Sequence, residues 1–303
     1  MKHIKLDGVD GSNPLGFLAA IGLLRVATSA GHDVRLGFAA DGSASAVLEG
    51  LVIPSEIAAL VAADAKQSAH SPAWWLTYQK AEKRGSKQVA DLKAPPAEFR
   101  EFLERCVECW TKGDGEAAAY AAAFGTDVAV DGKGNTKPTA FHFTAANQQF
   151  LGTVEAIRAS LSQEWIEASL FAGHGDRPGG NLRWDPGAER NWALMASNPN
   201  DEGTRVNAPL EWLAFRGLPL LPSFPRGARI ITTGVLGRGE DMTFTWPLWS
   251  LPASLPIVRS VLQLDWSGDA RDHIARGVFA VCTASIRRTA QGFGNFGPSA
   301  VTC

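Results

Sequence analysis

The sequence predicts an α+β protein, and three observations lead to this fold class. Residues 3–39 show strand, helix and strand patterns in turn, so the chain has an N-terminal β-α-β start. Helical patterns then dominate the middle of the chain. The C-terminal half is rich in loops and contains a hairpin pattern and a final helix pattern. These patterns together indicate α+β architecture rather than a repeat or an all-helical bundle.

The first helix pattern is the most apolar part of the chain. Ser12 or Asn13 is placed to cap it, since a short polar side chain can accept a hydrogen bond from the first turn. Residues 15–28 are apolar on nearly every side, so we expect a buried helix. Gly16 and Gly22 lack side chains and would let other backbone approach this helix closely.

Further helices are expected in the middle of the chain, over residues 54–66 and 95–125, the latter with a break at residues 112–115. Cys106 and Cys109 have the spacing of half a zinc site, but no second pair follows. We interpret them as core cysteines rather than ligands. The apolar stripe of this helix consists of Phe99, Phe102, Leu103, Cys106 and Trp110.

The segment from Asp131 to Leu151 joins a loop of glycine and lysine to a short alternating run and then to a helix. The alternating run, residues 140–144, is typical of a strand. Thr144 is expected to cap the helix that follows. His142 lies between two phenylalanines without an assured acid partner, so we expect a packed side chain on a strand.

The C-terminal half combines long loops with short elements. Residues 171–209 are the longest loop pattern, and loops of this length are usually functional or disordered. A short helix ending at Gly217 follows, and strand patterns at 229–236 and 242–246 indicate a hairpin. The last helix patterns cover residues 256–264 and 269–290.

Composition limits the classes of function. The 303 residues are 45% hydrophobic and 20% charged, which is typical of a globular protein with a large core. The net charge of −2 gives no overall basic field, so any binding of nucleic acid must use local patches. We expect no clean linker between two regions, residues 1–130 and 131–303. Without a signal-peptide pattern or an apolar run of about 20 residues, a cytoplasmic location is expected.

Few motifs indicate catalysis. The zinc-protease, serine-hydrolase and phosphate-loop patterns are absent, and we expect no cofactor. His174 and Asp176 lie two residues apart in the long loop, where they can serve as two metal ligands or as a base with its orienting acid. A metal-dependent nuclease that uses His142, His174 and Asp176 is therefore one hypothesis.

Basic and amide side chains in loops favour binding of nucleic acid, because cations contact phosphates and amides can pair with adenine. Trp74 and Trp75 precede a basic run through Lys93; they either stack on bases or anchor the core. The residues that we predict to contact nucleic acid are Lys133, Asn135, Lys137, Asn147, Gln148, Gln149, Arg177, Arg183, Arg190, Arg287 and Arg288.

Three stretches together resemble a known family. They are the start NPLGFLAAIGLLR, the segment KPTAFHFTAANQQFL with the later RWDP and ERNWAL, and the tail RRTAQGFGNFGP. They are similar to the small version of the large subunit of type I-U (also called I-G) CRISPR effector complexes, or Cascade.

The resemblance implies a non-catalytic subunit of a crRNA-guided antiviral surveillance complex. Such a subunit recognises the protospacer-adjacent motif in target DNA and helps open the duplex for a separate helicase-nuclease, while the guide reads the remaining sequence. The implied partners are the crRNA-guided backbone subunits, target DNA and the helicase-nuclease, with no membrane. A purely structural assembly protein, whose tryptophan-rich surface packs on partners, is the remaining alternative.

Overall fold

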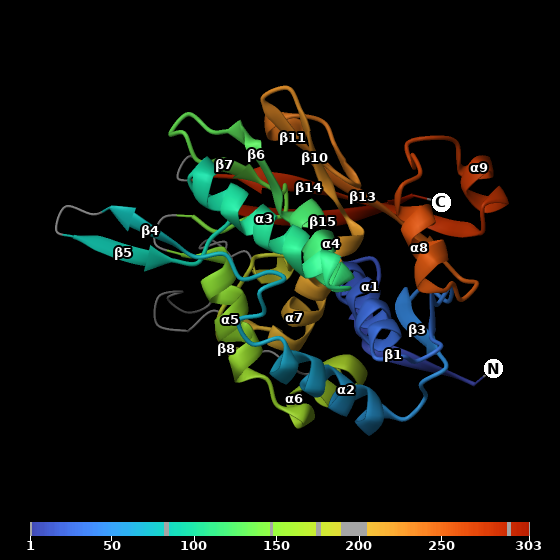
Figure 1. The fold of residues 1–303 in the computed structure, drawn as a ribbon. Helices are drawn as coiled ribbons and strands as arrows, with labels where there is room; N and C mark the ends of the chain where they lie inside the picture. The colour runs from blue at the N-terminus through green and yellow to red at the C-terminus, as the bar shows by residue number, and fades with distance from the viewer. Residues whose placement is uncertain are drawn as a thin grey trace, which may run out of the picture.

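The protein is described by a computed structural model that covers residues 2–81, 85–145, 148–173, 177–188, 205–289 and 292–302. Its helices are α1 (Pro14–Ser29), α2 (Pro54–Gln67), α3 (Pro96–Thr111), α4 (Gly115–Phe124), α5 (Phe150–Ser160), α6 (Gln163–Phe171), α7 (Ala208–Gly217), α8 (Leu255–Leu262) and α9 (Ala270–Ala275). They pack together with several small sheets (Figure 1).

The strands of the first half are β1 (His3–Asp10), β2 (Arg35–Phe38), β3 (Ser45–Glu49), β4 (Tyr78–Ala81), β5 (Ser86–Val89), β6 (Gly125–Val130) and β7 (Thr136–Pro138). Those of the second half are β8 (Arg177–Pro178), β9 (Arg205–Val206), β10 (Ser223–Arg226), β11 (Arg229–Thr232), β12 (Val235–Leu236), β13 (Thr243–Trp249), β14 (Val278–Arg288) and β15 (Gly294–Thr302).

The fold class is α+β, and the strand-helix-strand start is confirmed. In the first sheet, β1 and β2 flank β3, and both pair with it in antiparallel register. The largest sheet is antiparallel and has the order β12-β13-β14-β15. The hairpins β4–β5, β6–β7 and β10–β11 pair only within themselves. Figure 1 shows β4–β5 extending away from the helices on the left.

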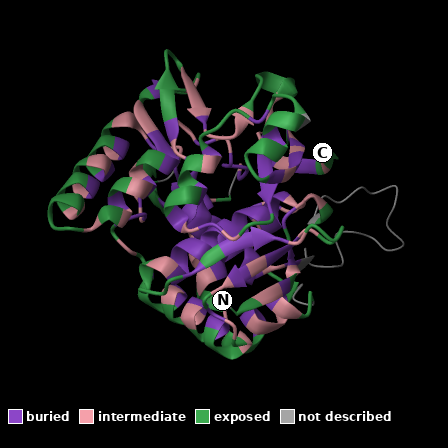
Figure 2. Ribbon diagram, turned by 90° about the vertical axis from the view of Figure 1, so that its right-hand side faces the viewer, coloured by how far each residue is buried: buried purple, intermediate pink, exposed green. Residues whose placement is uncertain are grey.

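Helix α1 begins at the position that the sequence indicates. The Asn13 side chain accepts a hydrogen bond from the Leu15 amide at 2.9 Å, and Pro14 occupies the first turn. Every residue from Pro14 to Ala27 is buried, which confirms the expected central helix. Figure 2 shows the buried residues concentrated in the middle of the molecule and the exposed ones on outer helices and loops.

Helices α1 and α7 cross at a contact between two glycines. A Cβ atom on Gly22 would lie 1.8 Å from the Leu213 carbonyl oxygen, and one on Gly217 would lie 2.5 Å from that of Leu18. Only residues without side chains fit at such a distance. The contact brings α7 into the core, where Phe215 packs against Trp74, Tyr120 and Phe150.

The predicted final helix over residues 269–290 is confirmed only at its start and is wrong after Ala275. Helix α9 ends at Ala275, Gly277 adopts a left-handed φ of +78°, and β14 follows. Residues 282–286 alternate between buried and half-buried positions, as expected of a strand with one face on the core, and residues 280–282 are buried on both faces. The branched and aromatic side chains of β14 suit a strand, and pairing with β13 and β15 outweighs the helical spacing.

Three other local predictions are wrong. Residues 140–144 form no strand, and α5 begins at Phe150 rather than after Thr144, because its first turn is capped by a distant part of the chain. Trp110 does not join the core stripe of α3: its side chain is 59% exposed, because the buried stripe of Phe99, Phe102 and Cys106 ends one turn earlier.

The predicted hairpin between residues 229 and 246 is partly right. The turn at residues 237–241 does join β12 to β13, and these strands pair. The strand predicted over residues 229–236 forms two separate strands instead. Its first part, β11, pairs with β10, and only the two residues of β12 pair with β13.

Replacing Gly22 with alanine tests the helix crossing. We expect Gly22→Ala to lower the free energy of unfolding by about 1–3 kcal/mol or more, because the new methyl group overlaps the backbone of α7. Gly115→Ala is the matched control, since nothing lies within 4 Å of the position that its methyl group would take. There we expect no loss, or a gain of about 0.4–1 kcal/mol. Urea denaturation measures both; equal losses would contradict the close crossing.

Candidate nucleic-acid interface: a lysine-lined cleft

A cleft of about 800 Å³ lies between the hairpin β4–β5 and the loop that joins β6 to β7. The start of α5 and Gly292, in the turn after β14, complete its walls. Both protruding segments lie on the same side of the molecule in Figure 1. Four lysines line the cleft: Lys80, Lys87, Lys93 and Lys133. No ion pair with a carboxylate forms at any of them among the described residues.

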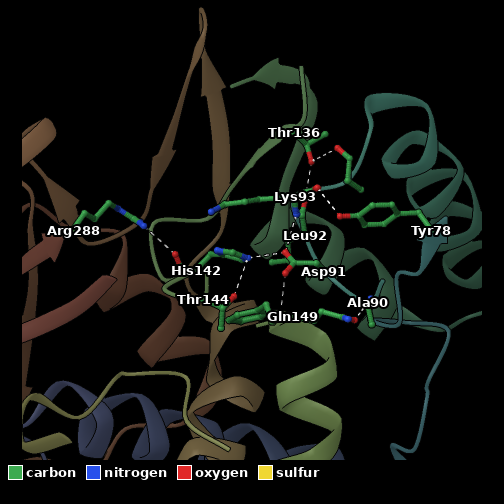
Figure 3. Close-up of polar contacts among 12 residues, drawn as sticks. Tyr78, Ala90, Asp91, Leu92, Lys93, Thr136, His142, Thr144, Gln149 and Arg288 are labelled. Atoms are coloured by element: carbon green, nitrogen blue, oxygen red, sulfur yellow. Dashed lines mark hydrogen bonds and ion pairs between the residues drawn. The ribbon is translucent and has the colours of Figure 1, made fainter. Parts of the chain in front are cut away.

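Asp91 joins three parts of the chain at the floor of the cleft. Its Oδ1 atom lies 2.8 Å from Nε2 of His142 and accepts a hydrogen bond from the Lys93 amide at 3.0 Å. Its Oδ2 atom accepts one from the Phe150 amide at 3.1 Å (Figure 3). The carboxylate therefore ties the end of β5 to residue 142 and to the first turn of α5.

Ala90 and Asp91, which follow β5, also explain why α5 begins at Phe150. Gln149, at the N-cap position, makes no local capping bond, so the helix depends on Asp91 and on the Ala90 carbonyl. That carbonyl accepts hydrogen bonds from the amides of Leu151 and Gly152. A distant strand end thus satisfies the free amides of the first turn, and no local cap is needed. Thr144 instead lies buried, with its hydroxyl 3.4 Å from Nε2 of His142.

Electrostatics favour the ionised form of Asp91. Burial alone would raise the pKa of this carboxyl. The charge and hydrogen bond of His142, with the amides of Lys93 and Phe150, outweigh burial and hold the pKa below its usual value. His142 is a packed side chain, as predicted, since it is 1% exposed and stacks on Phe150. Its Nδ1 atom has no hydrogen-bond partner among the described residues.

Lys93 lies over this floor and is half-buried. Its backbone is fixed because the Tyr78 hydroxyl donates to its carbonyl oxygen at 2.8 Å. Burial lowers the pKa of the Lys93 ammonium, and Asp91 only partly offsets this effect; the nearby charge of Arg288 lowers the pKa further. Figure 3 shows its side chain extending past the His142–Asp91 pair on the side of Arg288. An anionic ligand would stabilise the charged form of Lys93.

The loop opposite the hairpin is a tight turn built on Asp131. Its Oδ1 atom accepts hydrogen bonds from the amides of Lys133 and Asn135 at 2.8 and 3.0 Å. Gly134 adopts a φ of +80°, which a residue without a side chain tolerates. Because the turn holds the backbone, the Lys133 side chain is exposed at the rim of the cleft.

The cleft brings together four of the residues predicted to contact nucleic acid: Lys133, Asn135, Gln148 and Gln149. Gln148 is exposed, so its amide is accessible. Gln149 is half-buried, and its Oε1 atom accepts a hydrogen bond from the Ala90 amide at 2.7 Å. The side chain therefore also has a structural partner within the protein.

Two other predicted contacts have structural partners. Nζ of Lys137 donates to the Ala228 carbonyl at 2.7 Å and does not line the cleft. The Arg288 guanidinium donates to the carbonyls of His142 and Ala140 at 3.1 and 2.9 Å. Arg288 is not among the residues that line the cleft, and its two hydrogen bonds hold the segment from Ala140 to His142.

Three further predicted arginines, Arg177, Arg183 and Arg287, are not among the residues that line the cleft. Arg177 stacks over the Trp165 ring at 4.6 Å, and Arg287 lies on β14 next to the terminal strand β15. Arg183 stacks over Phe293 at 4.6 Å and has a left-handed φ of +66°. Four residues of the predictions lie outside the described residues: Asn147, His174, Asp176 and Arg190.

Sequence reasoning missed Asp91, the residue on which the floor depends. The signal was a single carboxylate between the apolar Ala90 and Leu92, since a buried charge requires partners.

Of the two interpretations of the tryptophan pair, the core anchor holds for Trp74, which is 0% exposed and packs against Phe215. Trp75 is half-buried against His70 and Trp74.

Within the described ranges, no three His, Cys, Asp or Glu side chains gather where they could hold a metal ion. Cys106 is buried in the core, and burial raises the pKa of its thiol to about 12.

Among the helices of the described ranges, none has the length and apolar character that a membrane span requires.

Comparison with models of known protein families gave no match, and neither did a search of curated proteins.

Removing the Asp91 charge tests the tie at the cleft floor. We expect Asp91→Asn to lower the free energy of unfolding at pH 7 by about 1–3 kcal/mol, because three hydrogen bonds lose their charged acceptor. A carboxyl whose pKa is lowered by folding contributes stability above the unfolded pKa of about 3.9 and loses it as pH falls through the folded value. Denaturation of both proteins between pH 7 and 3 should therefore show the difference narrowing below about pH 4. A difference that widens on acidification would contradict the assignment.

Proposed function

We propose that this protein binds nucleic acid and holds a sugar-phosphate backbone in the lysine-lined cleft. The observation that carries the proposal is the gathering of Lys80, Lys87, Lys93 and Lys133 around one cleft in a chain of net charge −2. Lysines that lack carboxylate partners and face each other across a cleft raise the local concentration of a polyanion.

Two acids, Asp91 and Asp131, line the cleft with the four lysines, so the lining keeps an excess of positive charge. Asp91 is paired with His142 and is 6% exposed. Asp131 uses its Oδ1 atom to hold the amides of its own turn. Both carboxylates therefore support the walls, and the four ammonium groups remain for phosphate oxygens, which they bind as point charges.

The cleft favours contact with the backbone over stacking on bases. Tyr78 is the one aromatic ring among its described lining residues apart from the imidazole of His142. The two rings are 9% and 1% exposed, so neither offers a free face to a base. Gln148 and Gln79 are exposed amides of the lining, and each can read a base edge next to the bound backbone.

At the level of the cell, we propose that the protein is the non-catalytic large subunit of a crRNA-guided antiviral surveillance complex. In that role it recognises the protospacer-adjacent motif and helps open target DNA for a separate helicase-nuclease. The stretches that resemble this family support the proposal because they meet around the cleft wall. Trp184 donates to the Phe141 carbonyl at 2.9 Å, the Gly294 amide donates to Phe143, and Arg288 donates to His142.

The first of the three stretches, near the start of the chain, also contacts the second. Nδ2 of Asn13 donates to Oδ1 of Asp185 at 3.1 Å, which connects the first stretch to the second. Residues that are far apart in the sequence and carry the resemblance thus build one region. The partners in this proposal are the backbone subunits with their guide, target DNA and the helicase-nuclease, and the protein works in the cytoplasm.

Salt dependence tests the proposal. We expect a labelled 30-base-pair duplex to bind with an affinity that falls steeply with salt, alone or with the guide-bound backbone subunits. Lys133→Gln should reduce the slope of log affinity against log salt by about 0.9, the value for one duplex phosphate contact. Lys66→Gln, an exposed lysine of α2 outside the cleft, is the matched control and should leave the slope unchanged.

A flat salt response under both conditions would refute nucleic-acid binding. Cleavage of the duplex with Mg²⁺ or Mn²⁺ that is lost in His142→Ala would favour the nuclease hypothesis instead. Stable co-purification with the backbone subunits, with no effect of nucleic acid, would favour a purely structural role.

A further inference from the structure

The hairpin β4–β5 carries two lysines directly opposite each other. Its antiparallel register pairs Lys80 with Lys87, next to the pair formed by Gln79 and Gln88. Side chains that face each other across two strands have Cβ atoms about 4.5–5.5 Å apart, and like charges there destabilise the pairing. Neither lysine has a carboxylate partner among the described residues.

The two lysines lie on the face of the hairpin that lines the cleft. Successive side chains of a strand alternate between faces, so Lys80 shares a face with Tyr78, and Lys87 shares it with Val89. Tyr78 and Val89 are buried at the base of the hairpin, and all four residues line the cleft. On the opposite face, Gln79 and Ala81 of β4 also line the cleft, whereas Gln88 of β5 does not.

The hairpin has little other support. It is a two-stranded sheet that pairs with no further strand, and Gln79, Lys80, Ala81 and the first three residues of β5 are exposed. Isolated two-stranded hairpins are marginally stable in water. A repulsive pair in such an element is a cost that folding alone does not explain, whereas an anion placed between the ammonium groups would turn the repulsion into attraction.

We infer that Lys80 and Lys87 form a clamp for one backbone phosphate and that binding of nucleic acid orders the hairpin. This inference rests on the proposed function of the cleft and specifies which element responds to the ligand. The phosphate oxygens accept hydrogen bonds from both ammonium groups, so one ligand group stabilises both strands. By linkage, whatever binds the paired form of the hairpin shifts its opening equilibrium toward the paired form.

The Lys87→Glu variant separates the stability of the hairpin from its affinity for the ligand. It places a carboxylate opposite Lys80 and so replaces repulsion with attraction, and the free protein should show slower amide hydrogen exchange in β4 and β5 than wild type. Its binding of the labelled duplex and of a labelled single strand should weaken at least tenfold at low salt. The slope of log affinity against log salt should fall by about 0.9, because the two lysines together neutralise one phosphate.

Two single-charge variants form the matched pair of controls. Lys87→Gln and Gln88→Glu each change the net charge by one unit, but on opposite faces of the same strand. Lys87→Gln should weaken binding and abolish the slowing of hairpin exchange by the oligonucleotide. Gln88→Glu should leave most of both effects in place. Equal losses in these two variants would show a general charge effect and would overturn the clamp.

The outcomes distinguish this inference from the proposed function. Binding by wild type that Lys87→Glu leaves intact would overturn the clamp alone. Absence of binding by wild type at low salt, with and without the backbone subunits, would overturn both. Inorganic phosphate is the second probe: if it slows hairpin exchange as strongly as the oligonucleotide does, the site takes a free anion, and the assignment to a nucleic-acid backbone is overturned.

Discussion

The structure depends on the contact between Gly22 and Gly217, where α1 and α7 approach to backbone distance. This crossing sets the depth at which α7 enters the core. From there, Phe215 contacts Trp74, Tyr120 and Phe150, which belong to three different parts of the chain. Because interiors are packed to the density of organic crystals, a shift of α7 would displace all three contacts together.

The cleft is connected to this core through a short series of contacts. Phe150 packs between Phe215 and the ring of His142, and its amide donates to Asp91. The floor is therefore rigid, whereas the cations at the rim stand on a two-stranded hairpin and on one tight turn. The cations at the rim therefore depend on fewer contacts with the core than the floor does.

A second cluster of charges in the core has a different role. The Arg216 guanidinium pairs with Asp64 and Glu116 and lies near the ring of Tyr120. Burial opposes the charge of Arg216, but Tyr120 and the two carboxylates outweigh it and raise its pKa well above the usual value. The charges of this network are satisfied by one another, unlike the four lysines of the cleft. The contrast explains why charged residues that look alike in the sequence belong to different parts of the structure.

The sequence by itself determined the features that depend on neighbours along the chain. It predicted the α+β class, the capped apolar helix α1, the break between α3 and α4 and the packed His142, because caps, turns and periodicity act over a few residues. It also placed Lys133 and Gln148 in one segment of interest.

The tertiary structure decided the features that depend on residues far apart in the sequence. Asp91 capped α5 from another element, pairing with β13 and β15 turned residues 278–288 into a strand, and the register of β4–β5 set Lys80 opposite Lys87. Contacts between elements override local preference where they satisfy more backbone groups, and no local pattern encodes such contacts.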